Sequence, residues 1–147
     1  MSVPPPAMAV RILIADDDAS IRGLLRRLIE NHQDWTVCGD ALNGRDAIDK
    51  AAELAPDLIV IDLAMPEMNG LEAAREISRW RPETPMLLLT VQQVSNELTA
   101  QAVRAGFRGA VSKSTGHEVI HGIETLLHHQ NFFQSARSDY SDWDRMI

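Results

Sequence analysis

The stretch Asp57–Gly70 reads DLIVIDLAMPEMNG and places a carboxylate directly after a short apolar run. The run Leu58–Ile61 lies between Pro56 and the turn-forming segment Pro66–Gly70, which predicts a strand buried on both faces. Open α/β folds bind their ligands at the carboxyl ends of such strands. Asp62 is therefore a candidate functional carboxylate, although aspartates are also common in turns for purely structural reasons.

Strand-like and helix-like segments alternate five times along the chain. The predicted strands are 10–15, 35–41, 58–61, 85–90 and a short one within 106–112, and the predicted helices include 21–29, 47–55, 71–80, 95–105 and 119–127. We expect the last helix to run to about His129. Near-continuous apolar strands that alternate with helices predict a parallel sheet covered on both faces. Right-handed crossovers then make it a doubly wound, five-stranded α/β fold.

Length and charge limit the classes of protein that this chain can represent. Its 147 residues suffice for one domain with a sizeable core. We assign a flexible N-terminal tail to 1–9, the domain to 10–129, and a C-terminal tail or the start of a linker to 130–147. The formal net charge of −7 argues against nucleic-acid binding by this chain itself.

The single cysteine, Cys38, excludes an intramolecular disulfide and a cysteine zinc site, and we expect it to be a small core residue. No apolar run approaches the length of a membrane span, and the N-terminus lacks the pattern of a signal peptide. The sequence therefore predicts a cytoplasmic protein without a membrane partner.

Polar side chains follow four of the five predicted strands. Asp16 and Asp17 come after the first strand, Asp62 after the third, Thr90 ends the fourth, and Lys113 follows the fifth. The carboxyl ends of parallel strands meet at one edge of the sheet, so we expect these side chains to share one cleft. Three crowded carboxylates repel each other, and a hard cation such as Mg²⁺ relieves that repulsion. With Mg²⁺ bound, Asp62 could attack phosphorus while Lys113 and Thr90 contact the phosphoryl oxygens.

This constellation resembles the receiver domain of the two-component response regulators. The resemblance rests on the residues named above and on the segments DLAMPEMNG, MLLLT and AGFRGAVSK, and it covers about Val10–His129. Receivers of LuxR/NarL-type regulators look most similar through AGFRGAVSK. The resemblance implies a CheY-like (βα)5 fold with strand order 2-1-3-4-5.

The resemblance also implies a metal site. Asp17 and Asp62 would bind Mg²⁺ through their side chains and Ala64 through its backbone carbonyl, while Asp16 would act mostly through water. Asp62 would be the phosphoacceptor.

Partners and output follow from the same resemblance. Thr90 would be the switch hydroxyl and Lys113 the phosphate partner. A histidine kinase or a phosphotransfer protein would be the donor. Phosphorylation would reshape the face made by the fourth helix, the fifth strand and the fifth helix, and so change contacts with a downstream protein or a second copy. Such a domain is not an enzyme beyond promoting its own phosphorylation and dephosphorylation, and it could regulate transcription as part of a longer chain.

Three positions depart from the family pattern. Ala110 stands where the family usually has an aromatic partner for the switch threonine, Val91 is bulkier than the residue often found there, and Ser114 replaces a common proline. A second hypothesis therefore stays open, namely an interaction module of the same fold that does not switch by phosphate. A third is a phosphohydrolase with an aspartate nucleophile, but the position of its general acid is occupied by Ala64.

Several other residues have structural interpretations. We expect Asp18 to cap the first helix, Trp80 to cover the core at the end of its helix, and Phe107 to be a packing residue. The aromatic residues after His129, beginning with Phe132 and Phe133, predict either a partly disordered end or docking onto the domain or a partner.

Overall fold

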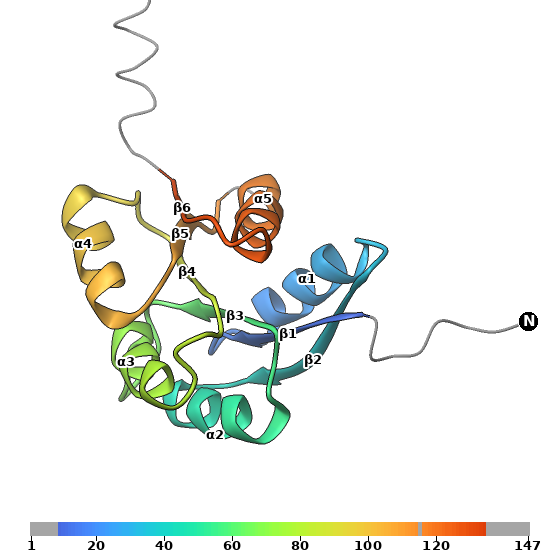
Figure 1. The fold of residues 1–147 in the computed structure, drawn as a ribbon, viewed down its shortest axis with the longest axis horizontal. Coiled ribbons are helices and arrows are strands. Elements are labelled where there is room, and N and C mark those ends of the chain that lie inside the picture. The colour runs from blue at the N-terminus through green and yellow to red at the C-terminus, as the bar shows by residue number, and fades with distance from the viewer. Residues whose placement is uncertain (1–8, 115, 135–147) are drawn as a thin grey trace, which may run out of the picture.

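A computed structural model describes residues 9–114 and 116–134, and its elements alternate along the chain (Figure 1). The elements are β1 Val10–Ala15, α1 Ala19–Glu30, β2 Trp35–Ala41, α2 Gly44–Leu54, β3 Leu58–Asp62, α3 Gly70–Trp80, β4 Met86–Thr90, α4 Asn96–Ala105, β5 Gly109–Ser112, α5 Gly116–Leu127 and β6 Phe132–Phe133. Two parts of the predicted tails lie outside the described residues, namely 1–8 of the N-terminal tail and 135–147 of the C-terminal tail.

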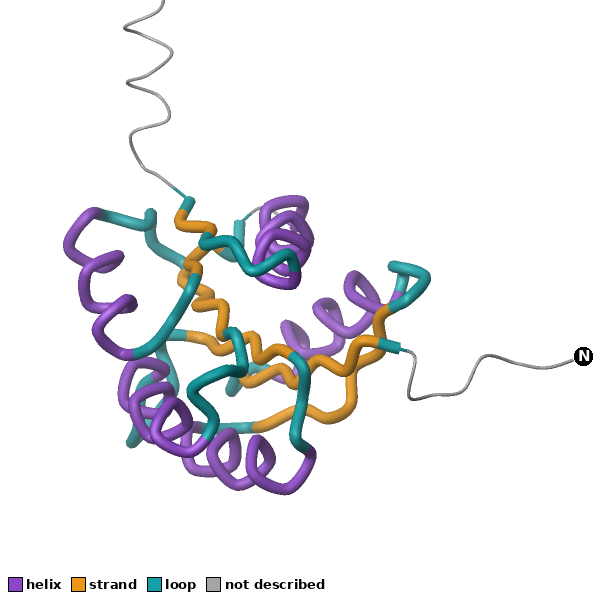
Figure 2. Tube along the Cα trace, viewed as in Figure 1, coloured by secondary structure: helices purple, strands orange, loops and turns teal. Residues whose placement is uncertain are grey.

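The strands form one parallel sheet with the order β2-β1-β3-β4-β5-β6. Figure 2 shows the strands in orange, with helices on both sides of them. The predicted α/β fold and the order 2-1-3-4-5 are confirmed. The sixth strand was not anticipated, because two residues are too few to show an alternating pattern. It lies within the segment that was predicted to be a tail, and it confirms that Phe132 and Phe133 dock onto the domain.

Two apolar cores lie on opposite faces of the sheet. Helices α2, α3 and α4 cover one face, and α1 and α5 cover the other (Figure 1). All five residues of β3 are buried, as the apolar run Leu58–Ile61 predicted for a central strand. Their side chains alternate between the two cores, with Ile59 and Ile61 in one and Leu58 and Val60 in the other.

Three further residues test packing predictions. Phe107 is buried, as expected, and Cys38 is half-buried against the core on the α2–α4 face. The expectation for Trp80 was wrong, because its side chain is 78% exposed. Trp80 is the last residue of α3, so its position extends beyond the stretch of the helix that packs on the sheet.

Candidate functional site

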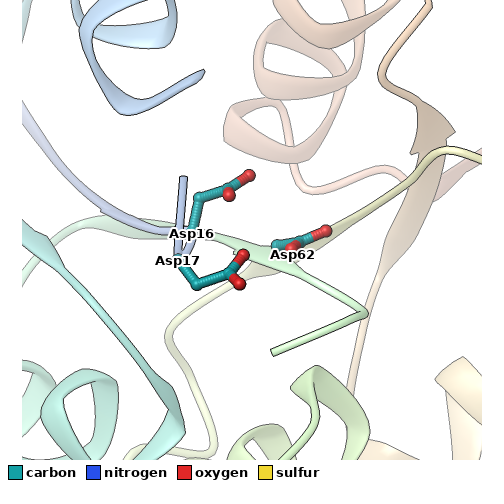
Figure 3. A group of neighbouring side chains, drawn as sticks. All are labelled: Asp16, Asp17 and Asp62. Atoms are coloured by element: carbon teal, nitrogen blue, oxygen red, sulfur yellow. The ribbon is translucent and has the colours of Figure 1, made fainter. Parts of the chain in front are cut away.

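Asp16 and Asp62 lie side by side at the carboxyl edge of the sheet. Asp16 follows the last residue of β1, Asp62 is the last residue of β3, and the register pairs Ala15 with Ile61 immediately before them. Asp16 is fully buried and Asp62 is 3% exposed, whereas Asp17 is exposed. Figure 3 shows the three carboxylates gathered over the ends of β1 and β3. The predicted convergence of these residues is therefore present in the structure.

A hydrogen bond within the turn after β1 positions the buried carboxylate of Asp16. The amide of Asp18 donates to Asp16 Oδ1 at 2.9 Å, and the Asp18 carboxylate in turn caps α1 by accepting from Ser20 and Ile21. The N-cap prediction for Asp18 is thus confirmed. The run of three acids contains one helix cap, one buried carboxylate and one exposed carboxylate, and each has a different environment.

The loop after β3 is folded tightly against Asp62. The Gly70 amide donates to the Leu63 carbonyl at 2.8 Å, and a Cβ at Gly70 would overlap the backbone carbonyl of Asp62. Only glycine allows this close approach. The glycine that ends the DLAMPEMNG motif therefore fixes the path of the loop over the candidate site.

The carboxylates of Asp16, Asp17 and Asp62 form a set that fits a divalent cation. One oxygen from each lies within 4.8 Å of the others. Asp16 Oδ2 is buried, and among the described residues the group that offsets its desolvation is the charged ammonium of Lys113, not a neutral donor. Hard cations such as Mg²⁺ prefer oxygen ligands of this type. Among the described residues, this is the group of acidic, histidine or cysteine side chains that has metal-binding geometry.

Lys113 provides the positive charge of the site. Its ammonium Nζ lies 2.7 Å from Asp16 Oδ2 and 3.0 Å from Asp62 Oδ1. The backbone amide of Lys113 donates to the Thr90 carbonyl at 2.8 Å, which anchors the residue to β4. Sequence reasoning placed Lys113 in the same cleft but did not anticipate its contact with Asp16, because the direction of a long side chain is not visible in strand order.

The pKa values of this cluster reflect its burial. Burial raises the pKa of Asp62, and the negative charge of Asp16 raises it further, while Lys113 and the Ala64 backbone act in the opposite direction. Burial lowers the pKa of Lys113, but the hydrogen bonds and charges of Asp16 and Asp62 outweigh that effect and leave it above its ordinary value. The site therefore favours a charged lysine and penalises a second negative charge at Asp62.

Thr90 ends β4 next to the site and is 2% exposed. Its hydroxyl oxygen accepts a hydrogen bond from the Gln92 amide at 3.1 Å, and its position is in register with Ser112 of β5. The next residue, Val91, is 74% exposed, and Ala110 is fully buried in the core on the α4 face.

Residues 12–124 match the response regulator receiver domain family. The chain belongs to this family. The general role of receiver domains is to accept a phosphoryl group in two-component signalling, and they bind Mg²⁺ at an acidic pocket. They interact with histidine kinases and downstream effectors.

Named relatives support this assignment. The chemotaxis protein CheY of Thermotoga maritima is 35% identical over 106 residues, which cover 72% of this chain and 87% of CheY. The transcriptional regulatory protein YdfI of Bacillus subtilis is 38% identical over 110 residues, which cover 75% of this chain but 51% of YdfI. The receiver domain thus spans about half the length of YdfI.

Solved structures show the same fold. A LuxR-family two-component response regulator from Aurantimonas sp. SI85-9A1 has a TM-score of 0.82 at 29% identity, with 95% of this chain and 99% of that chain covered. The response regulator domain of Thermotoga maritima CheB has a TM-score of 0.74 at 30% identity, with 79% and 94% covered. The resemblance to LuxR/NarL-type receivers is confirmed. In the described part of the receiver, no helix is long and apolar enough to cross a membrane.

Proposed function

We propose that this receiver accepts a phosphoryl group on Asp62 in a Mg²⁺-dependent reaction and transmits its state through protein–protein contacts. The observation that carries the proposal is the position of Lys113 Nζ, 3.0 Å from Asp62 Oδ1 in a cluster that also holds two further carboxylates. A nucleophilic carboxylate needs neighbouring cations to approach an anionic phosphoryl group, and this cluster offers one ammonium and the ligands for a metal.

The transfer step is a substitution at phosphorus. A carboxylate oxygen of Asp62 forms a bond to phosphorus, and the bond from phosphorus to the donor breaks. When the donor is a phosphohistidine, the imidazole nitrogen leaves with the electron pair and takes a proton from solvent. When the donor is acetyl phosphate, acetate leaves without needing a proton. Lys113 contacts a phosphoryl oxygen, and the Thr90 hydroxyl donates to another, because its contact with the Gln92 amide uses an oxygen lone pair and not the hydroxyl hydrogen.

Asp17 and Asp62 would provide the side-chain ligands for Mg²⁺, with the Ala64 carbonyl as a third ligand and Asp16 acting through water. The three carboxylates, with one oxygen of each within 4.8 Å of the others, support this assignment, because a bound cation would offset their mutual repulsion. When bound, Mg²⁺ withdraws charge from the transferring phosphoryl oxygens.

The donor in this proposal is a histidine kinase or a phosphotransfer protein, and the output surface is formed by α4, β5 and α5. Thr90 supports this choice, because it lies in register with Ser112 of β5 and directly precedes the connection to α4. A downstream protein, a second copy of the chain, or a DNA-binding domain of a longer chain would read this surface.

Intact-mass spectrometry after treatment with acetyl phosphate and Mg²⁺ tests the proposal. We expect a phosphoryl adduct on the wild type and none on Asp62→Asn. The matched control is Asp49→Asn, which removes an exposed carboxylate of α2 and should leave the adduct intact. Chelation of Mg²⁺ should abolish the adduct.

A specific observation also favours the second candidate, a phosphate-independent interaction module. Ala110 is buried at the position where the family usually has an aromatic residue, so the ordinary partner of Thr90 on β5 is absent. Absence of an adduct on both the wild type and Asp49→Asn would support this alternative and overturn phosphorylation.

A further inference from the structure

The short strand β6 extends the sheet beyond β5 through a continuous set of hydrogen bonds. The Phe132 amide donates to the Arg108 carbonyl at 3.0 Å, and the Gln134 amide donates to the Ala110 carbonyl at 2.8 Å. The next hydrogen bond along β5 involves a side chain and not the backbone, because Oε1 of Gln134 accepts from the Ser112 amide at 2.7 Å. The residue that follows β6 therefore contacts the last residue of β5 through its side chain.

The domain is shaped to receive β6. A Cβ at Gly109 would lie 2.5 Å from the Phe132 carbonyl, and a Cβ at Gly122 would lie 3.3 Å from the Phe132 ring. Phe132 packs against the core under α1 and α5, and Phe133 packs against the opposite core. The Phe132 ring lies edge-on to the His121 ring, with 4.8 Å between the ring centroids. Two small residues and two aromatic anchors thus secure a strand of only two residues.

The contact made by Gln134 lies one residue from the candidate site. Ser112 is in register with Thr90, and Lys113 follows it directly, with its own amide bonded to the Thr90 carbonyl. Ser112 is 8% exposed, and a buried amide without a partner is strongly disfavoured. The end of β5 is therefore anchored from two sides, by β4 through Thr90 and by the C-terminal segment through Gln134.

We propose that Gln134 is a positioning residue, which acts through Ser112 on Lys113, and that docking of β6 is therefore coupled to the state of the phosphorylation site. This inference rests on the proposed function and adds that the state of the phosphorylation site is transmitted to β6. In the proposed function, phosphorylation changes the partners of Lys113. Lys113 directly follows Ser112, whose amide donates to Gln134. Coupling is reciprocal, so loosening β6 must change the site as much as the site changes β6.

Three variants of the full chain isolate the hydrogen bond. Gln134→Met keeps the length of the side chain and removes the acceptor, whereas Gln134→Glu restores an acceptor oxygen. Gln130→Met makes the same chemical change at an exposed position before β6 and is the matched control. The readouts are amide hydrogen exchange of Ser112 by NMR and the rate constant of phosphorylation by acetyl phosphate.

We expect Gln134→Met to speed Ser112 exchange and to slow phosphorylation, each by a factor of about 3 to 10, the range of one neutral hydrogen bond. Gln134→Glu should recover most of both effects, and Gln130→Met should match the wild type. Faster Ser112 exchange with an unchanged phosphorylation rate would overturn the positioning role. Unchanged exchange in Gln134→Met would overturn the proposal at its first step.

A reciprocal measurement needs no phosphorylation and separates this inference from the proposed function. Lys113→Met should speed exchange of the Gln134 amide more than that of Val37 in β2, at the opposite edge of the sheet, which reports general loosening. Equal changes at the two amides would overturn the coupling. A selective change at Gln134 in a protein that forms no adduct would support the coupling while the proposed function fails.

Discussion

The ammonium of Lys113, which follows β5, lies 3.0 Å from Oδ1 of Asp62, the last residue of β3, although β4 separates these two strands in the sheet. The same ammonium lies 2.7 Å from Asp16 Oδ2, which follows β1. One side chain therefore neutralises buried charges that the chain delivers from two other strands.

Removal of the ammonium should strongly destabilise the fold. Lys113→Met leaves Asp16 and Asp62 buried without their cation, and loss of one partner from a buried ion pair typically costs about 3–5 kcal/mol. Urea unfolding at neutral pH checks this expectation. The control is Lys50→Met, which removes a half-buried ammonium whose salt bridge to Asp46 lies outside the site. Its loss of unfolding free energy should be below about 1 kcal/mol. Equal losses in the two variants would contradict a special role for the Lys113 cluster.

The pH dependence of stability should change when Asp62 is replaced by asparagine. Because folding raises the pKa of Asp62, its contribution is fully present below its unfolded-state pKa of about 4 and is lost as pH rises through the folded-state pKa. The asparagine side chain would stay neutral at every pH. Without metal, Asp62→Asn should therefore be more stable than the wild type at neutral pH, by about 1 kcal/mol on the usual scale of single substitutions.

Unfolding in urea with chelator, from pH 4 to pH 8, measures this difference. The advantage of Asp62→Asn should shrink toward zero at the acidic end, where the wild-type carboxyl is also neutral. Asp49→Asn, on the exposed face of α2, should follow the wild type throughout. A constant difference across the pH range would mean that packing, and not charge, causes the effect.

Mg²⁺ should raise the melting temperature of the wild type, because ligands that bind only the folded state stabilise it. At a metal concentration about 100 times the dissociation constant, the gain is about 2.7 kcal/mol. Asp17 is exposed and would provide a ligand in the proposed metal site, so Asp17→Asn should melt like the wild type in chelator and lose the gain in Mg²⁺. An identical shift in both proteins would place the metal elsewhere.

Asp18 should affect stability without affecting the metal. Its carboxylate caps α1 through the amides of Ser20 and Ile21. Asp18→Ala should lose about 1 kcal/mol of unfolding free energy, and Asp18→Asn should retain most of the cap. The gain in melting temperature on Mg²⁺ addition should be the same in both variants and in the wild type. A reduced gain in Asp18→Asn would show that the third acid of the run contributes to the metal site.

The sequence supports different conclusions at different residues. The buried run Leu58–Ile61 was predicted as a central strand because a strand covered on both faces needs apolar residues at every position, and that signal is local. Trp80 was misplaced because an apolar residue at helical spacing predicts packing only while the helix still lies on the sheet, and the end of α3 does not. Phe132 and Phe133 showed no strand signal, because their pairing depends wholly on the edge of β5.

The order of residues alone was enough to establish the alternation of strands and helices, the buried central strand, and the five residues that end those strands at one edge. These properties follow from apolar periodicity and from parallel topology, which delivers every strand end to the same side. The folded domain was needed to show that Lys113 contacts Asp16 as well as Asp62, and that the Gln134 side chain accepts a hydrogen bond from the Ser112 amide. Such contacts join residues far apart in the chain, and their geometry depends on side-chain directions and strand edges that exist only after the sheet is assembled.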